Sequence, residues 1–194
     1  MNEIYTLSED KKTLIEINDK SITEFSIPEG VTRIESSYFG GAFGGCTSLQ
    51  SIDIPNSVTE IGNYAFRGCT SLQSIFVAKD NTSLKSVDGV LYNINLTKII
   101  RVPQNCPKSS FTIPNSVTEI GDWAFEGCTS LQSIDIPNSV TEIGGYAFEG
   151  CTSLQSIDIP NSVTKIKYSA FSDCSSLQNI DIPNSVTEIW GWCF

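Results

Sequence analysis

A block of 23 residues that repeats along the chain constrains its fold more than any other feature. In residues 136–158 the block contains an Ile-Pro pair, a Gly-Gly pair, an Ala-Phe pair, a cysteine and the segment Leu-Gln-Ser-Ile-Asp. The Ile-Pro pair begins at Ile27, Ile54, Ile113, Ile136, Ile159 and Ile182, and the last three intervals are each 23 residues. A fixed period of about 20 to 29 residues with a Leu-x-x-Ile-x-Ile core is typical of leucine-rich repeat solenoids.

Each block is expected to form one coil of such a solenoid. Ile134 and Ile136 alternate with polar residues, as a half-buried strand requires. Pro137 ends this strand because it has no N–H to donate. Residues 140–143 are expected to form a second short strand, and residues 147–151 a single helical turn. Equivalent residues of neighbouring coils then lie about 4.8 Å apart, and stacking of neighbours stabilises the array.

The predicted fold is therefore a repeat solenoid, a leucine-rich repeat horseshoe with a parallel β-sheet face, short second strands and single helical turns on the other side. The 194 residues form one predicted domain with four segments. These are residues 1–26, an N-terminal variant unit that acts as a cap; 27–77, repeats; 78–112, an irregular variant unit with an insertion; and 113–194, regular repeats of which the last is incomplete.

The motif Leu-x-x-Ile-x-Ile-Pro-x-x-Val-x-x-Ile-Gly-x-x-Ala-Phe-x-x-Cys resembles the BspA-like leucine-rich repeat of bacterial and protozoan surface proteins. The resemblance covers residues 27–77 and 113–194, and more weakly 1–26 and 78–112. It implies adhesion through a rigid scaffold, with a host extracellular matrix or cell-surface protein as the partner, at the cell surface or after secretion. It supplies no catalytic residues.

Composition excludes most other functions. The chain contains no histidine, which removes Ser-His-Asp and Cys-His catalysis and the commonest transition-metal ligand. A net charge of −10 disfavours nucleic acids and anionic membranes. No apolar run approaches the roughly 20 residues that span a bilayer, and the N-terminal segment does not have the pattern of a signal peptide. We expect no enzymatic activity, no cofactor, no metal, no nucleic acid and no membrane insertion.

The residue between the two core-facing isoleucines, here called the strand-face position, is expected to point into solvent. It is an aspartate in the regular coils, and the row is interrupted by an aromatic, an arginine and a threonine. An exposed aromatic residue beside an arginine is typical of a binding hot spot. The candidate ligand-binding residues are Asp53, Phe76, Arg101, Thr112, Asp135, Asp158 and Asp181.

Several alternatives remain open for this row. The aspartates form a solvated face without a ligand, they attract a basic protein partner, or they bind calcium through the stacked carboxylates. Separately, the insertion over residues 78–108 folds over Phe76 and buries it. The predicted function is a non-enzymatic protein-recognition or adhesion module that binds a protein ligand on the strand face. The alternative function is a structural spacer of a longer surface protein.

Two further repeat positions are expected to serve packing. Five of the seven cysteines share one position, and parallel side chains are poorly oriented for disulfides. Buried thiols are therefore expected there, and Cys106, in a loop expected to be exposed, is the most reactive candidate. The cysteines of the column are Cys46, Cys69, Cys128, Cys151 and Cys174. Tyr64, Trp123, Tyr146 and Trp192 share an aromatic position that is expected to pack between coils rather than to form a carbohydrate platform.

The C-terminal end of the array carries a separate expectation. The last copy stops at Phe194 with no polar capping segment, and repeat arrays need capped ends. Ile182, Val186, Ile189 and Phe194 would leave an apolar face and open strand edges. We expect either that the natural chain is longer or that two chains pair end to end as a homodimer.

Overall fold

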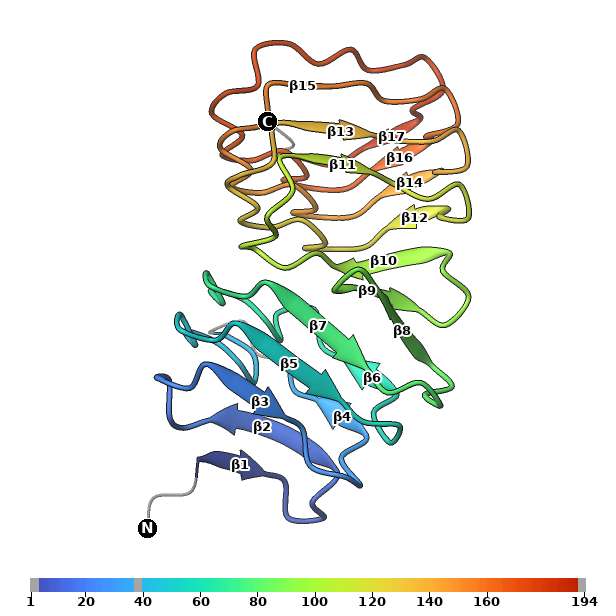
Figure 1. The fold of residues 1–194 in the computed structure, drawn as a ribbon. Helices are drawn as coiled ribbons and strands as arrows, with labels where there is room; N and C mark the ends of the chain where they lie inside the picture. Colours follow the sequence, from blue (N-terminus) through green and yellow to red (C-terminus); the bar gives the residue numbers. More distant parts are fainter. Residues whose placement is uncertain (1–3, 37–39, 192–194) are drawn as a thin grey trace. The chain divides into compact units, whose positions relative to one another are not determined.

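The structure is a computed structural model that describes residues 4–36 and 40–191. It divides into two compact units, Met1–Ile94 and Asn95–Phe194. Within each unit the chain forms coils whose short strands pair with the equivalent strands of the neighbouring coil (Figure 1). The predicted repeat solenoid with stacked parallel strands is thus confirmed.

The first unit contains two rows of parallel strands between two antiparallel hairpins. The opening hairpin joins β1 (Tyr5–Leu7) to β2 (Thr13–Ile17). One row then runs from β2 through β4 (Arg33–Ile34) to β6 (Glu60–Ile61). The other contains β3 (Glu24–Ser26), β5 (Ser51–Ile54) and β7 (Ser74–Val77). The closing hairpin joins β8 (Leu84–Val87) to β9 (Val90–Asn93).

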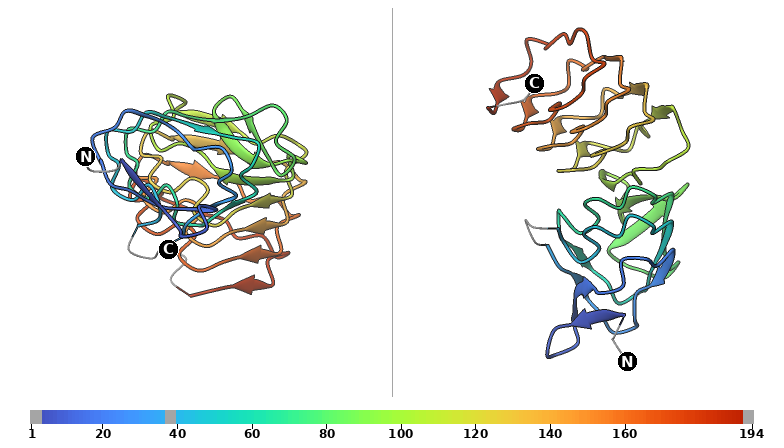
Figure 2. Two further views of the ribbon diagram at one scale, coloured as in Figure 1. Left: turned by 90° about the horizontal axis from the view of Figure 1, so that it is seen from below. Right: turned by 90° about the vertical axis from the view of Figure 1, so that its left-hand side faces the viewer.

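The second unit also contains two rows of parallel strands. Its row of second strands contains β10 (Lys98–Arg101), β12 (Glu119–Ile120), β14 (Glu142–Ile143), β16 (Lys165–Ile166) and β17 (Glu188–Ile189). The stacked yellow to red arrows at the right-hand side of the left view of Figure 2 belong to this row. Its strand face contains β11 (Ser110–Thr112), β13 (Ser133–Asp135) and β15 (Ser156–Ile157). An isolated parallel bridge between Asp158 and Asp181 adds the next coil.

The interior consists of columns of like residues. Phe125, Phe148 and Phe171 are buried and stack with ring centroids 5.0 and 5.4 Å apart. In the first unit, Phe43 and Phe66 stack in the same way at 5.4 Å. Because one coil is too thin to enclose these rings, each ring loses its water by contact with the next coil.

The predicted helical turn is wrong, since the described residues contain no helix. The corner of each coil is a series of tight turns, in which the Cys151 N–H donates to the Phe148 carbonyl oxygen at 3.1 Å. Tyr146 and Gly150 have φ values of 56° and 69°, a left-handed conformation that a right-handed helix cannot contain. The Phe148 N–H instead donates to Ala170 of the next coil at 2.8 Å. Within the described ranges there is accordingly no helix long and apolar enough to cross a membrane.

Candidate functional site

In the first unit, the strand-face position brings Ser26, Asp53 and Phe76 side by side. The three residues are paired in register on β3, β5 and β7, and all three are exposed. The Ser26 hydroxyl donates to Asp53 Oδ2 at 2.9 Å. The Phe76 side chain is 50% exposed, which is unusual for a large apolar residue on an ordered strand.

A shallow hollow surrounds these side chains. Its lining includes Ser26, Glu29, Asp53, Pro55, Phe76 and Ala78. Among the described residues that line it, the charged ones are Glu29 and Asp53, both acidic. The hollow therefore combines an exposed aromatic ring with two carboxylates.

The insertion after Phe76 leaves the ring accessible. The Ile75 N–H donates to the Gly89 carbonyl oxygen at 2.9 Å, and the Val77 N–H to Ser86 Oγ at 3.0 Å. Residues 86–89 therefore run along the edge of β7 and satisfy its backbone, without covering its outer face. The alternative in which the insertion buries Phe76 is wrong.

In the second unit, the strand-face position forms an acidic row. Thr112 pairs with Asp135, and the row continues through Asp158 to Asp181. All four side chains are exposed. The three consecutive aspartates place like charges on neighbouring coils, and no aromatic residue stands in this row within the described part of the chain.

The structure excludes Arg101 from the strand face. Arg101 lies on β10, in the row of second strands, and its side chain points inward and is only 4% exposed. Its Nη1 donates to the Trp123 carbonyl oxygen, and its Nη2 donates to Glu126 Oε2, both at 2.7 Å. Gln104 Nε2 donates to the same Glu126 oxygen at 2.8 Å. Arg101 therefore holds the corner of the next coil, and its predicted place on the exposed strand face beside Phe76 is wrong.

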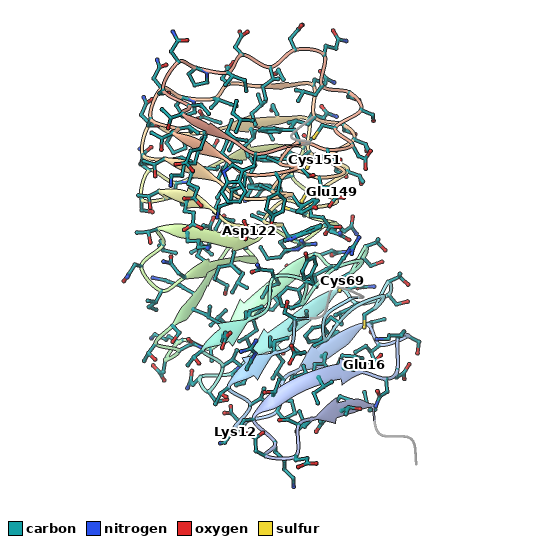
Figure 3. All side chains as sticks on the ribbon, turned by 180° about the vertical axis from the view of Figure 1, so that it is seen from behind. Lys12, Glu16, Cys69, Asp122, Glu149 and Cys151 are labelled. Carbon is teal, nitrogen blue, oxygen red and sulfur yellow. The ribbon has the colours of Figure 1, made fainter. Side chains whose placement is uncertain are left out.

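The cysteine column has a structural role in both units. Three of the thiols donate to a phenylalanine carbonyl oxygen of the preceding coil: Cys69 to Phe43 at 3.3 Å, Cys151 to Phe125 at 3.2 Å and Cys174 to Phe148 at 3.1 Å. The Cys128 thiol donates instead to the Pro103 carbonyl oxygen at 3.7 Å. Figure 3 labels Cys69 and Cys151. Burial raises the pKa of the Cys128 thiol to about 12 and that of Cys174 to about 11. A raised thiol pKa keeps these side chains neutral and unreactive.

Cys106 departs from its prediction. It is a free cysteine like the other described ones, but it is buried rather than exposed. Its N–H donates to the Pro103 carbonyl oxygen at 3.0 Å, and a small cavity places it beside Phe111 and Cys128. The loop turns inward at this residue, so Cys106 is not a surface thiol.

The aromatic position packs between coils, as expected. Trp123 and Tyr146 stack with ring centroids 4.1 Å apart, and Tyr168 and Trp190 continue the column at 5.3 and 5.9 Å. Tyr168 occupies the space that a Cβ on Gly145 would need, which explains how its ring joins the column from a neighbouring repeat position. Trp192 lies outside the described residues.

The last described coil is less covered than the others. Ile182 and Val186 are half-buried and Ile189 is exposed, while Phe194 lies outside the described residues. Pairing of two chains through this end stays a prediction.

These features define a leucine-rich repeat solenoid. Six copies of the BspA type Leucine rich repeat region match residues 17–106 and 102–194. The chain belongs to this family. The match includes all of residues 78–112 and residues 17–26 of the N-terminal variant unit, the two segments whose resemblance in sequence is weaker.

Solved structures of bacterial proteins share the fold. The pneumococcal vaccine antigen PcpA superimposes with a TM-score of 0.74 at 25% identity, over 88% of this chain and 47% of its own. A leucine rich cell surface protein from Faecalibacterium prausnitzii A2-165 gives 0.59 at 31% identity, over 87% of this chain and 55% of its own. A leucine-rich repeat protein from Bacteroides ovatus ATCC 8483 superimposes with a TM-score of 0.52 at 27% identity, over 96% of this chain and 53% of its own. The chain thus spans about half the length of these relatives. The curated proteins contain no match.

Proposed function

We propose that the chain is a non-enzymatic protein-recognition or adhesion module, which binds a protein ligand on its strand face. The contact residues are Asp53 and Phe76 in the first unit and Thr112, Asp135, Asp158 and Asp181 in the second. The observation that carries the proposal is the exposed Phe76 ring in an acidic hollow. Aromatic residues dominate the binding energy of many protein interfaces, because they bury a large area with few rotatable bonds.

The scaffold supports the same conclusion. The strand-face residues stand on backbone that is hydrogen-bonded from coil to coil, so their positions are fixed before a ligand arrives. A preorganised surface loses little conformational entropy on binding. The family also fits, since one relative is described as a leucine rich cell surface protein. A host extracellular matrix or cell-surface protein is accordingly the proposed class of partner.

The repeat architecture argues against catalysis by the aspartates. General acid–base chemistry needs two carboxyl groups with different environments. Asp135 and Asp158 are both exposed at the same position of neighbouring coils, so both carboxylates are solvated in the same way. The acidic row is therefore suited to charge complementarity with a partner rather than to proton transfer.

Solid-phase binding to a panel of purified extracellular-matrix proteins tests the proposal. The wild-type chain is expected to bind at least one of them, and a variant with Phe76→Ala and Asp53→Asn is expected to bind at least about tenfold more weakly, a loss typical of a hot spot. Glu60→Gln is the matched control, because Glu60 is an exposed acid of the same unit on the other row of strands.

Melting temperatures of all variants are measured in parallel, because both substitutions are on the surface and should leave folding intact. No binding by the wild-type chain would favour the structural spacer instead. Equal binding by the wild-type chain and the double variant would show that the ligand does not use Phe76 and Asp53.

A further inference from the structure

We propose that the hollow around Phe76 holds an arginine side chain from a basic segment of the protein ligand. The inference rests on the proposed function and narrows the chemistry of its partner. It depends on three observations in the first unit: the position of the ring, the fixed carboxylate beside it and the charge of the hollow.

The ring and the carboxylate are placed so that one cation can contact both. Asp53 and Phe76 are register partners on adjacent parallel strands, and such partners lie about 4.8 Å apart. A cation over an aromatic face is attracted within about 6 Å of the ring centroid. A guanidinium that covers the Phe76 face therefore remains within reach of the Asp53 carboxylate.

The carboxylate is held in place on its other side. The Ser26 hydroxyl donates to Asp53 Oδ2 at 2.9 Å, which restricts the rotation of the carboxylate. The second oxygen, Oδ1, is left for a ligand. Glu29, which also lines the hollow, adds a second negative charge.

The charge of the hollow selects a cation. Its charged lining residues, within the part of the chain that the structure describes, are Glu29 and Asp53. Arg33 of the same unit forms an ion pair of 2.9 Å with Glu60, on the other row of strands. A net charge of −10 over the chain adds long-range attraction for a basic partner.

Arginine fits this hollow better than lysine. Its planar guanidinium stacks on an aromatic face and at the same time presents N–H donors to a carboxylate at its edge. Lysine is a more strongly hydrated point charge, which must lose more water to lie on a ring. The exposed ring of Phe76 beside a fixed carboxylate is the combination that a guanidinium uses fully.

The second unit provides an internal comparison. Asp135 occupies the equivalent position, but its neighbours are Thr112 and Asp158 rather than a serine and an aromatic ring. If negative charge alone attracted the ligand, the three aspartates of this row would bind it more tightly than the hollow does. If the ring is required, Asp135 should be dispensable.

Fluorescence anisotropy at physiological ionic strength tests the inference with a defined probe. The probe is a fluorescein-labelled peptide in which arginine alternates with glycine, and its control replaces each arginine with citrulline, a neutral group of the same shape. The wild-type chain is expected to bind the arginine peptide and not the citrulline peptide. Phe76→Ala and Asp53→Asn are each expected to weaken binding about fivefold, and Asp135→Asn by less than about twofold.

Phe76→Leu separates the ring from its apolar bulk. It keeps a large apolar side chain but removes the aromatic face, so we expect it to bind as weakly as Phe76→Ala. Wild-type affinity in Phe76→Leu, or an equal loss in Asp135→Asn and Asp53→Asn, would overturn the inference. Equal binding of the arginine and citrulline peptides would do the same.

The failure of this inference can be told apart from the failure of the proposed function. A chain that binds a matrix protein through Phe76 and Asp53, yet does not bind the arginine peptide, recognises another chemistry in the same hollow. A chain that binds neither probe contradicts both proposals.

Discussion

The two units have the same repeat but differ at the strand-face position. In both, serine pairs with serine and isoleucine with isoleucine in the same register: Ser51 with Ser74 in the first, Ser133 with Ser156 in the second. The neighbouring position presents Asp53 beside Phe76 in one unit and Asp135 beside Asp158 in the other. The backbone thus determines where a side chain stands, and a single replacement changes what the surface can bind.

The largest expected effect is the difference in stability between removing a buried phenylalanine ring and removing an exposed one. Phe148 is buried between Phe125 and Phe171, whereas Phe76 is half exposed. Phe148→Ala should lower the free energy of unfolding by about 3 to 5 kcal/mol, because the cavity removes ring contacts with two coils. Phe76→Ala should change it by less than about 0.5 kcal/mol. Urea unfolding of each variant, followed by circular dichroism, measures both values.

A small loss in Phe148→Ala would mean that neighbouring coils close the cavity. Tryptophan emission provides a control for the location of the effect, because all three tryptophans, Trp123, Trp190 and Trp192, belong to the second unit. Phe148→Ala should therefore shift the tryptophan transition, and Phe76→Ala should not.

Ion pairs show a similar contrast between buried and exposed positions. Arg101 and Glu126 form a 2.7 Å pair whose side chains are 5% and 14% exposed, whereas Arg33 and Glu60 form an exposed pair of 2.9 Å. Arg101→Met should cost about 3 kcal/mol of stability, since Glu126 keeps its charge without its partner. Arg33→Met should cost less than about 1 kcal/mol. Thermal melting of the two variants makes the comparison.

The double variant with Arg101→Met and Glu126→Met tests the cause of that loss. Removing both charges should restore most of the stability, because replacing a buried pair with apolar groups is often neutral. No recovery would show that the hydrogen bond from Arg101 to Trp123, rather than the ion pair, holds the coil.

The buried thiols should make stability depend on alkaline pH. Burial raises the pKa of Cys128 to about 12 in the folded chain, while an unfolded cysteine has a value of about 8.5. The neutral thiol is favoured by folding, so its contribution is fully present below the unfolded pKa. It is lost as the pH rises toward 12, at up to about 1.4 kcal/mol per pH unit for one thiol. Unfolding in urea at pH 8, 9 and 10 measures this slope.

Cys128→Ala should be less stable at pH 8 but should show a shallower slope above pH 9. Cys46 in the first unit provides the comparison, because burial raises its pKa as well. An unchanged slope in Cys128→Ala would mean that this thiol does not ionise differently in the folded and unfolded chains.

The sequence predicts these features unevenly, for physical reasons. Where the period is constant, as from Ile113 to Ile182, it predicts the register and therefore the columns, including exposed Asp135 and buried Cys151. Between Val77 and Ile113 the interval is not 23 residues, so the sequence does not predict the register of the residues there. The sequence therefore misplaces Arg101, which lies on β10 in the row of second strands, where Lys98 pairs with Glu119.

The backbone conformation at the corner of each coil is the other feature that the sequence does not predict. Trp123 and Tyr146, each directly before an Ala-Phe pair, adopt positive φ, which aromatic residues seldom do. Their rings stack at 4.1 Å, and the Phe125 N–H donates to Ala147 of the next coil at 2.7 Å. Contacts between coils thus override the local preference of each residue, and no single block reveals them.

The smallest expected effect concerns the aspartates themselves. Asp158 lies between Asp135 and Asp181, so it faces like charges on both sides. Asp158→Asn should raise the free energy of unfolding by about 0.5 kcal/mol at low ionic strength, because it removes repulsion along the row. Asp53→Asn should give no gain, because Asp53 has no aspartate neighbour and its carboxylate accepts the Ser26 hydrogen bond.

Salt provides the control for this difference. At about 1 M salt the screening length falls to about 3 Å, so the gain in Asp158→Asn should vanish while the value for Asp53→Asn stays the same. Thermal melting at low and high salt measures both. An equal stabilisation of the two variants would mean that Asp158 experiences no more like-charge repulsion than Asp53 does. The acidic row of the second unit would then have no excess repulsion that a basic partner could relieve.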